Sequence, residues 1–75
     1  MNQLSEKLIA LRVKFNYSQQ YLADTLGISQ AAYSKRERGK TEYSLTFLQS
    51  IAGIYSIPLV NLLDMTVEEL IGESE

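Results

Sequence analysis

The chain has 75 residues and a formal net charge of −2, and it contains neither cysteine nor histidine. This length is that of one small domain, and the missing residue types exclude disulfides, thiolate or imidazole metal sites and a catalytic triad with a histidine base. No apolar run is as long as the roughly 18 residues that a membrane span needs. The first residues do not have the pattern of a signal peptide. We therefore expect a soluble, cytoplasmic protein.

The charges are distributed unevenly along the chain. Residues 1–41 carry all seven basic groups and three acidic groups, whereas residues 42–75 carry six acidic groups and no basic group. The net charges of the two parts are therefore +4 and −6. Such an asymmetry hints at nucleic-acid binding by the basic part, although charged runs are more often plain solvated surfaces.

Helical periodicity dominates the first half of the chain. A first apolar stripe follows the spacing i, i+4, i+7 and i+11 and consists of Leu4, Leu8, Leu11 and Phe15. Ser18 and Ser29 are good N-caps for two further helices. Gly27 and Gly39 stand where these two helices need a left-handed residue in order to end.

The second half continues the helical pattern. A fourth helix is predicted from about Ser44, and the residues that we expect to face inward are Leu45, Leu48, Ile51, Ala52 and Tyr55. Pro58 opens a short fifth helix that carries Leu59, Leu62 and Leu63. The segment Thr66-Val67-Glu68-Glu69 has the pattern of a capping box and predicts a sixth helix of one or two turns. Since no useful alternating pattern occurs, we predict an all-α bundle of five or six short helices.

Only Gly27-Ile28-Ser29 separates the second predicted helix from the third. A turn this short, with glycine where a positive φ is needed, crosses two helices steeply, as in a helix-turn-helix. Residues 18–40, SQQYLADTLGISQAAYSKRERGK, resemble the core of the lambda-repressor-like, Cro/Xre-type helix-turn-helix family of DNA-binding proteins. The resemblance extends over roughly residues 4–64 and implies that the second helix of the motif, residues 29–38, enters the major groove.

The exposed face of this third helix carries the candidate base-reading residues. The i, i+3 and i+4 spacing places Gln30, Ala31, Ser34, Lys35 and Arg38 on one face. Glutamine can pair with adenine, lysine can donate to guanine, and alanine can contact a thymine methyl group. We expect Gln30 and Lys35 to be the principal base readers, with Ala31 and Ser34 beside them. Without the motif, a polar surface with no partner would be the favoured interpretation.

A second group of residues is predicted to bind DNA phosphates: Gln19, Arg36, Arg38, Lys40 and Thr41. Gln19 lies at the start of the second helix, where free N–H groups favour an anion, and the resemblance implies a backbone contact there. Arg38, Lys40 and Thr41 follow at the end of the third helix. Arg36 stands where the family usually has an apolar residue, so its head is expected either in solvent above the core or on a phosphate.

Three further residues are predicted to be structural. The resemblance implies an ion pair between Arg12 and Glu37 that ties the first helix to the recognition helix, and arginine suits it because its planar fork binds a carboxylate in bidentate fashion. Tyr43 can offer its hydroxyl to the DNA backbone, but we expect it to pack onto the fourth helix through Leu48.

These observations predict a sequence-specific regulator of transcription that binds double-stranded DNA. We expect a repressor that binds a palindromic operator as a homodimer, with residues 1–65 as the helix-turn-helix domain and residues 66–75 as an acidic C-terminal helical extension. Apolar residues between 54 and 71 are the candidate dimer contacts, although core packing would use the same residues. No cofactor, metal ion, membrane or small-molecule substrate is expected.

Two other classes of function remain as alternatives. One is a protein-interaction module, for example an antitoxin-type partner with weak or lost DNA binding, and its support is the acidic net charge. The other is an enzyme, which has the least support. No base is positioned for a serine nucleophile, and the adjacent Glu68 and Glu69 diverge by about 100° on a helix.

Overall fold

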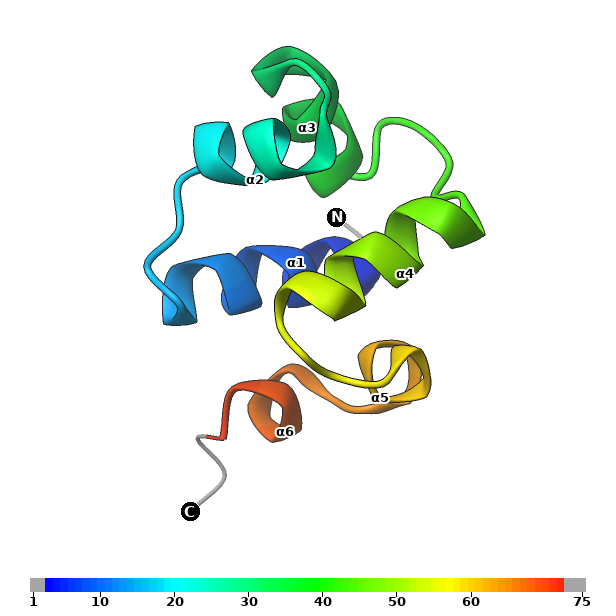
Figure 1. Ribbon diagram of the computed structural model, residues 1–75. Coiled ribbons are helices and arrows are strands. Elements are labelled where there is room, and N and C mark those ends of the chain that lie inside the picture. The colour runs from blue at the N-terminus through cyan, green and yellow to red at the C-terminus, as the bar shows by residue number, and fades with distance from the viewer. Residues whose placement is uncertain (1–2, 73–75) are drawn as a thin grey trace.

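The computed structural model describes residues 3–72, and this part of the chain forms six helices and no strand (Figure 1). The helices are α1 (Gln3–Lys14), α2 (Gln19–Leu26), α3 (Gln30–Glu37), α4 (Leu45–Ile54), α5 (Leu59–Asp64) and α6 (Val67–Ile71). Figure 1 shows α2 and α3 on one side of α1, with α5 and α6 on the other. The predicted all-α bundle is confirmed. Residues 73–75 of the expected extension lie outside the described residues.

The helix starts follow from three serines. Ser18, Ser29 and Ser44 have extended backbones, and each side chain accepts a hydrogen bond from the backbone N–H three residues later, at 2.9, 3.1 and 3.0 Å. Each bond satisfies one of the N–H groups that a helix start leaves free. Gly27 and Gly39 adopt positive φ angles of 74° and 75° after α2 and α3, as predicted.

Two other helices end at left-handed residues that are not glycine. Asn16 and Ser56 have φ angles of 60° and 57°, after α1 and α4 respectively. The N–H of Tyr17 then bonds back to the carbonyl oxygen of Arg12 at 2.9 Å, and the N–H of Ile57 bonds to that of Ala52 at 3.0 Å. Asparagine tolerates this conformation because its side chain can hydrogen-bond locally.

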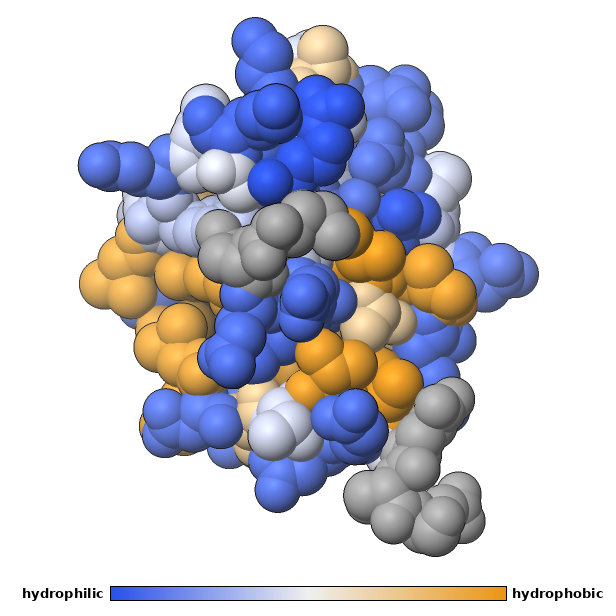
Figure 2. Space-filling view, turned by 180° about the vertical axis from the view of Figure 1, so that it is seen from behind, coloured by the Kyte–Doolittle hydropathy of each residue, from blue (hydrophilic) through white to orange (hydrophobic). Residues whose placement is uncertain are grey.

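The core lies between α1, the α2–α3 pair, α4 and α5. Its buried hydrophobic residues are Leu8, Leu11, Leu22, Ala23, Tyr33, Phe47, Leu48, Ile51, Ala52, Tyr55 and Leu62. Burial of one large side chain of this kind stabilises a fold by about 1.5–3 kcal/mol. The large hydrophobic residues that stay exposed are Val13, Phe15, Tyr21, Leu45, Val60 and Leu63. In Figure 2 mostly hydrophilic residues cover the α2–α3 end, and hydrophobic residues gather on the other half of the molecule.

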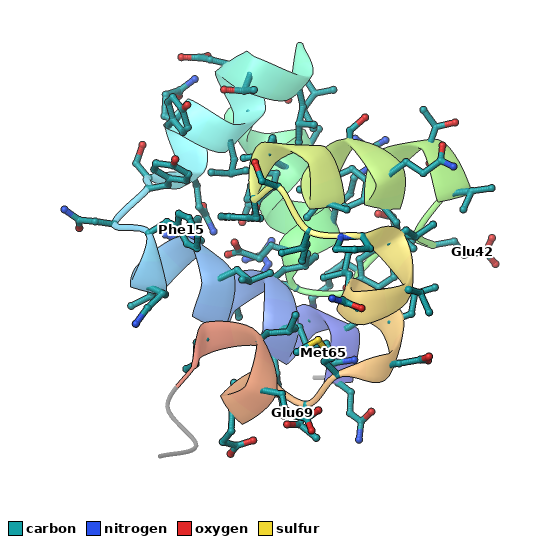
Figure 3. The ribbon with its side chains drawn as sticks, turned by 60° about the horizontal axis from the view of Figure 1, so that its bottom comes forward. Phe15, Glu42, Met65 and Glu69 are labelled. Atoms are coloured by element: carbon teal, nitrogen blue, oxygen red, sulfur yellow. The ribbon has the colours of Figure 1, made fainter. Side chains whose placement is uncertain are left out.

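Two expected core positions are wrong. Phe15 lies just beyond the end of α1 (Figure 3), and its side chain is 44% exposed, with its ring 4.9 Å from that of Tyr55 at the rim of the core. Leu45 is 60% exposed because it is the first residue of α4, before the helix reaches the core. The periodic spacing ran past the end of α1 for Phe15 and reached the first residue of α4 for Leu45, and at such terminal positions it does not ensure burial.

The sixth helix is present and packs against α1. The side chain of Thr66 accepts a hydrogen bond from the N–H of Glu69 at 3.1 Å, and the carboxylate of Glu69 accepts one from the N–H of Thr66 at 2.9 Å. This is the predicted capping box. Leu70 and Ile71 pack against the edge of the core. Among residues 3–72, no helix combines the length and the hydrophobicity required to cross a membrane.

Candidate nucleic-acid interface

Helices α2 and α3 form a closely packed pair joined by residues 27–29. The left-handed Gly27 lets the chain reverse within this short link, and Ser29 starts α3 directly afterwards. The two helices form one end of the molecule (Figure 1). The sequence LADTLGISQAAYSKRE therefore folds locally into the predicted helix-turn-helix.

The two sides of α3 have different surroundings. Tyr33 and Glu37, one turn apart, are buried at 0% and 2% exposure and fix the inner side. Gln30, Ala31 and Lys35 are exposed, and Ser34 is partly buried. Neither Gln30 nor Lys35 forms a side-chain hydrogen bond to another residue within 3–72, so both keep their donors for a partner.

The basic residues gather around the second half of α3. Arg38, Lys40 and Thr41 are exposed at the end of α3 and in the loop that follows. A shallow groove of about 230 Å³ reaches Thr41, and its lining residues are Ser29, Ala31, Ala32, Lys35, Arg36 and Thr41. The groove therefore brings candidate base-reading residues and candidate phosphate-binding residues to one surface.

Arg36 lies at this groove with its guanidinium held by an aromatic ring. The central guanidinium carbon is 5.4 Å from the centre of the Phe47 ring, within the range of a cation–π contact. Tyr43, which we expected to pack through Leu48, stacks on the same Phe47 with ring centres 6.2 Å apart. Arg36 is thus partly buried and lines the groove, with its guanidinium over the Phe47 ring.

Glu37 is the centre of a buried hydrogen-bond network, which we call the Glu37 network: Ser5, Arg12, Gln19, Tyr33 and Glu37. Arg12 Nε lies 2.7 Å from Oε2 and Arg12 Nη2 lies 3.2 Å from Oε1, so the ion pair is bidentate. Tyr33 Oη donates to Oε2 at 2.8 Å, and Gln19 Nε2 donates to Oε1 at 2.9 Å. The hydroxyl of Ser5 donates to the backbone carbonyl oxygen of Glu37. The network thus joins α1, α2 and α3.

The protonation state of this network follows from its contacts. Burial by itself would raise the pKa of Glu37, but hydrogen bonds from Arg12, Gln19 and Tyr33, with the charge of Arg12, lower that pKa below its ordinary value. The hydrogen bond to Glu37 raises the pKa of Arg12. Burial, followed by the charge of Glu37, raises the pKa of Tyr33. The pair is therefore fully ionised near neutral pH, which suits a structural role and not proton transfer.

Sequence reasoning missed three members of the network: Ser5, Gln19 and Tyr33. Gln19 was assigned to a phosphate, yet its side-chain amide lies against Glu37. Tyr33 is four residues before Glu37 on the same helix, so the i, i+4 spacing was a usable signal. Among residues 3–72 there is no group of three or more acidic residues that could hold a metal ion, and the chain has no cysteine or histidine.

Comparisons with known proteins agree with this geometry. A model of the helix-turn-helix family matches residues 8–62. The chain is 37% identical over 70 residues to the HTH-type transcriptional regulator AnsR of Bacillus subtilis (strain 168), a match that covers 93% of this chain and 53% of AnsR. It is 35% identical over 75 residues to the SPbeta prophage-derived uncharacterized HTH-type transcriptional regulator YonR of the same organism, covering 93% of this chain and 69% of YonR.

The chain thus spans about half the length of AnsR and about two thirds of the length of YonR. No solved structure matches the chain significantly.

Proposed function

The chain belongs to the helix-turn-helix family, and from this premise we propose that it is a sequence-specific DNA-binding regulator of transcription with α3 as its recognition helix. The observation that carries the proposal is the two-sided character of α3. Its inner side is fixed by buried Tyr33 and Glu37, and its outer side presents Gln30 and Lys35 with free donors. The names of the relatives, both transcriptional regulators, support the same conclusion and favour no enzyme activity.

We assign base reading to Gln30, Ala31, Ser34 and Lys35. The amide of Gln30 can pair with adenine N6 and N7, and the ammonium group of Lys35 can donate to guanine O6 and N7. Ala31 is exposed beside them and offers a methyl group to thymine. Such contacts distinguish base pairs because the major groove presents a different pattern for each.

We assign phosphate binding to Gln19, Arg36, Arg38, Lys40 and Thr41. These residues flank the base-reading face at the start of α2 and around the end of α3. Phosphate contacts fix the orientation of a protein on the duplex and supply affinity that does not depend on sequence. The acidic second half of the chain carries no basic group, so it discourages binding through the opposite side.

We further propose that two copies bind a palindromic operator and repress transcription by blocking a promoter. Helix-turn-helix dimers bind half-sites about 10 bp apart. The candidate dimer surface contains the exposed Val60 and Leu63 of α5, within the apolar segment 54–71. In this proposal residues 1–65 are the DNA-binding domain and residues 66–75 are an acidic extension, of which α6 rests on α1. Such a repressor would work in the cytoplasm, on the DNA.

The experiment that tests the proposal is selection of bound duplexes from random-sequence DNA by the purified protein. We expect a consensus with two inverted half-sites, which would support DNA binding and dimerisation together. A consensus without symmetry would support DNA binding and contradict the dimeric operator. Recovery of no sequence above background would contradict DNA recognition and favour a protein-interaction module.

A variant series then separates the two assigned groups of residues. Gln30→Ala and Lys35→Ala should each weaken binding to the selected duplex by about 1–3 kcal/mol and relax the preference at particular base pairs. Arg38→Ala should weaken binding to all duplexes by a similar factor. If the base-reading variants and Arg38→Ala behave alike in a competition assay, our division of the interface is wrong.

A further inference from the structure

Arg36 lies on α3 next to the buried Glu37, at the border between the inner side of the helix and its exposed face. Its side chain is partly buried, whereas Lys35 and Arg38 are exposed. The central carbon of its guanidinium is 5.4 Å from the centre of the Phe47 ring, which belongs to α4. Within the described part of the chain this is the one cation–π contact. A different helix therefore supports the head of this arginine.

The ring of Phe47 is itself fixed by its neighbours. Its side chain is 8% exposed. The ring centre of Tyr33, on α3, lies 6.5 Å away, and that of Tyr43, in the loop before α4, lies 6.2 Å away in a stacked arrangement. The position of the ring thus depends on the packing of the core, and the ring offers the guanidinium a rigid support.

The contact with Phe47 leaves the hydrogen-bond donors of Arg36 available. A guanidinium rests on an aromatic ring through its flat face, whereas its N–H bonds lie in its plane and point outward from its edge. Within residues 3–72 these donors have no protein acceptor, and the ion pair found there joins Arg12 and Glu37. A partly buried cation with unused donors is suited to an acceptor from outside the chain.

The surroundings of Arg36 favour an anion as that acceptor. The groove of about 230 Å³ that it lines also contains Lys35 and the hydroxyl groups of Ser29 and Thr41, and no acidic residue lines it. The nearby Glu42 belongs to a different hollow and points away from the molecule (Figure 3). Since Lys35 is also an assigned base-reading residue, an anion in this groove would belong to the same duplex. A backbone phosphate is such an anion, and the planar donors of arginine match it in bidentate fashion.

We propose that Phe47 is a positioning residue for DNA binding, whose ring holds the guanidinium of Arg36 in the groove so that its free edge meets one backbone phosphate beside the base-reading face. This inference rests on the proposed function and deepens it, because it gives a residue of the core a role in DNA binding. Phe47 touches no DNA. It favours binding because Arg36 is already ordered when the duplex arrives, so less conformational entropy is lost.

One test follows the side chain of Arg36 in the wild-type protein by NMR, with its signals assigned by their loss in Arg36→Met. In the free protein the ring current of Phe47 should shift the CH₂ protons of Arg36 from their ordinary positions. Addition of the selected duplex should move the Nε–H signal downfield and leave the shifted CH₂ signals in place. The proposal is overturned if the CH₂ signals return to ordinary positions on DNA binding, or if the Nε–H signal does not respond.

A second test is a double-mutant cycle on the affinity for the selected duplex. Phe47→Leu removes the aromatic face and keeps an apolar side chain in the core. It should lower the affinity about threefold in the wild-type background, and it should have no effect in the Arg36→Met background, where no guanidinium remains to be held. Arg38→Met is the matched control background, because Arg38 is exposed and the threefold loss should persist there.

Circular dichroism establishes that each variant is folded at the temperature of the assay. A threefold loss that persists in the Arg36→Met background would show that Phe47 acts only through the stability of the core, and it would overturn the positioning role. If Phe47→Leu does not fold, the NMR test decides, since its DNA titration uses the wild-type protein.

The two proposals fail in different ways. If the wild-type protein selects no duplex, the proposed function has failed, and the role of Phe47 fails with it. If the wild-type protein selects a duplex and the effects of Phe47→Leu and Arg36→Met simply add, only the inference about Phe47 has failed.

Discussion

The two halves of the molecule share one apolar core and differ in their buried polar contacts. Residues 3–41, with α1 to α3, contain the Glu37 network, in which a buried ion pair and its hydrogen bonds join three helices. Residues 42–72, with α4 to α6, are held by apolar packing and by helix caps. Their acidic side chains are exposed, as Figure 3 shows for Glu42, which points away from the molecule.

The difference corresponds to what each half does. Apolar packing tolerates changes of shape, whereas bidentate and charge-assisted hydrogen bonds work in one geometry. A recognition helix must meet base edges at a fixed angle. The directional hydrogen bonds of the Glu37 network, on the buried side of α3, can hold it at such an angle. One basic residue of the first half also reaches the second: buried Lys7 donates from Nζ to the carbonyl oxygens of Leu62 and Leu63, at 3.1 and 2.8 Å.

The strongest test of this contrast is removal of the central carboxylate. Glu37→Ala leaves Arg12 and the hydroxyl of Tyr33 without their buried acceptor, and we expect it to lower the free energy of unfolding by about 3–5 kcal/mol. Thermal unfolding followed by circular dichroism measures the effect. The matched control is Glu42→Ala, an exposed carboxylate that should change stability by less than about 0.5 kcal/mol. Equal melting temperatures for the wild-type protein and Glu37→Ala would show that the network does not hold the first half.

The second half should respond to loss of apolar volume. Leu62 is 0% exposed and Leu63 is 46% exposed, although they are neighbours on α5. Leu62→Ala should cost about 2–5 kcal/mol because it removes buried methyl groups and leaves a cavity. Leu63→Ala should leave the stability of the monomer nearly unchanged and weaken the proposed dimer, as measured by analytical ultracentrifugation. Similar stability losses in the two variants would contradict the described packing of α5.

Acid should weaken the first half more than the second. The pKa of Glu37 is lowered in the folded protein, so its contribution is complete above the ordinary glutamate pKa and is lost as the pH falls through the lowered value. The stability gap between the wild-type protein and Glu37→Gln should therefore be largest near neutral pH. It should shrink below about pH 4.5. Urea unfolding at several pH values measures the gap, and a gap that stays constant down to acid pH contradicts this account.

The smallest expected effect concerns a helix cap in the second half. Ser44 accepts the N–H of Phe47 at 3.0 Å, and Ser44→Ala should cost about 1 kcal/mol. Ser50 lies exposed within the same helix, so Ser50→Ala should be neutral or slightly stabilising. A chemical denaturation series measures both variants. If Ser44→Ala and Ser50→Ala have the same stability, the Ser44 cap does not stabilise the start of α4.

The sequence predicted those features whose signals are local. The three serine caps, the left-handed Gly27 and the capping box at Thr66 each act within about four residues, so their spacing is visible in the chain. The six helices and the exposed face of α3 follow from such signals.

Contacts between residues far apart in the sequence could not be predicted from local spacing. The position of Gln19 suited a phosphate by the same local logic, and its bond to Glu37 depends on how α2 crosses α3. Lys7 gave no local signal for its bonds to the end of α5. Phe15 continued an apolar pattern past the end of α1, and Leu45 continued one to the first residue of α4, and both side chains stay exposed at these helix termini.

The central claim, that the α3 side binds duplex DNA, is tested most directly by the salt dependence of binding to the selected duplex. The logarithm of the binding constant should fall linearly with the logarithm of salt concentration, with a slope of about −0.9 for each phosphate neutralised. Arg38→Ala should reduce that slope by about 1, and Gln30→Ala should weaken binding without changing it. No measurable binding, or an affinity that does not respond to salt, would contradict the account.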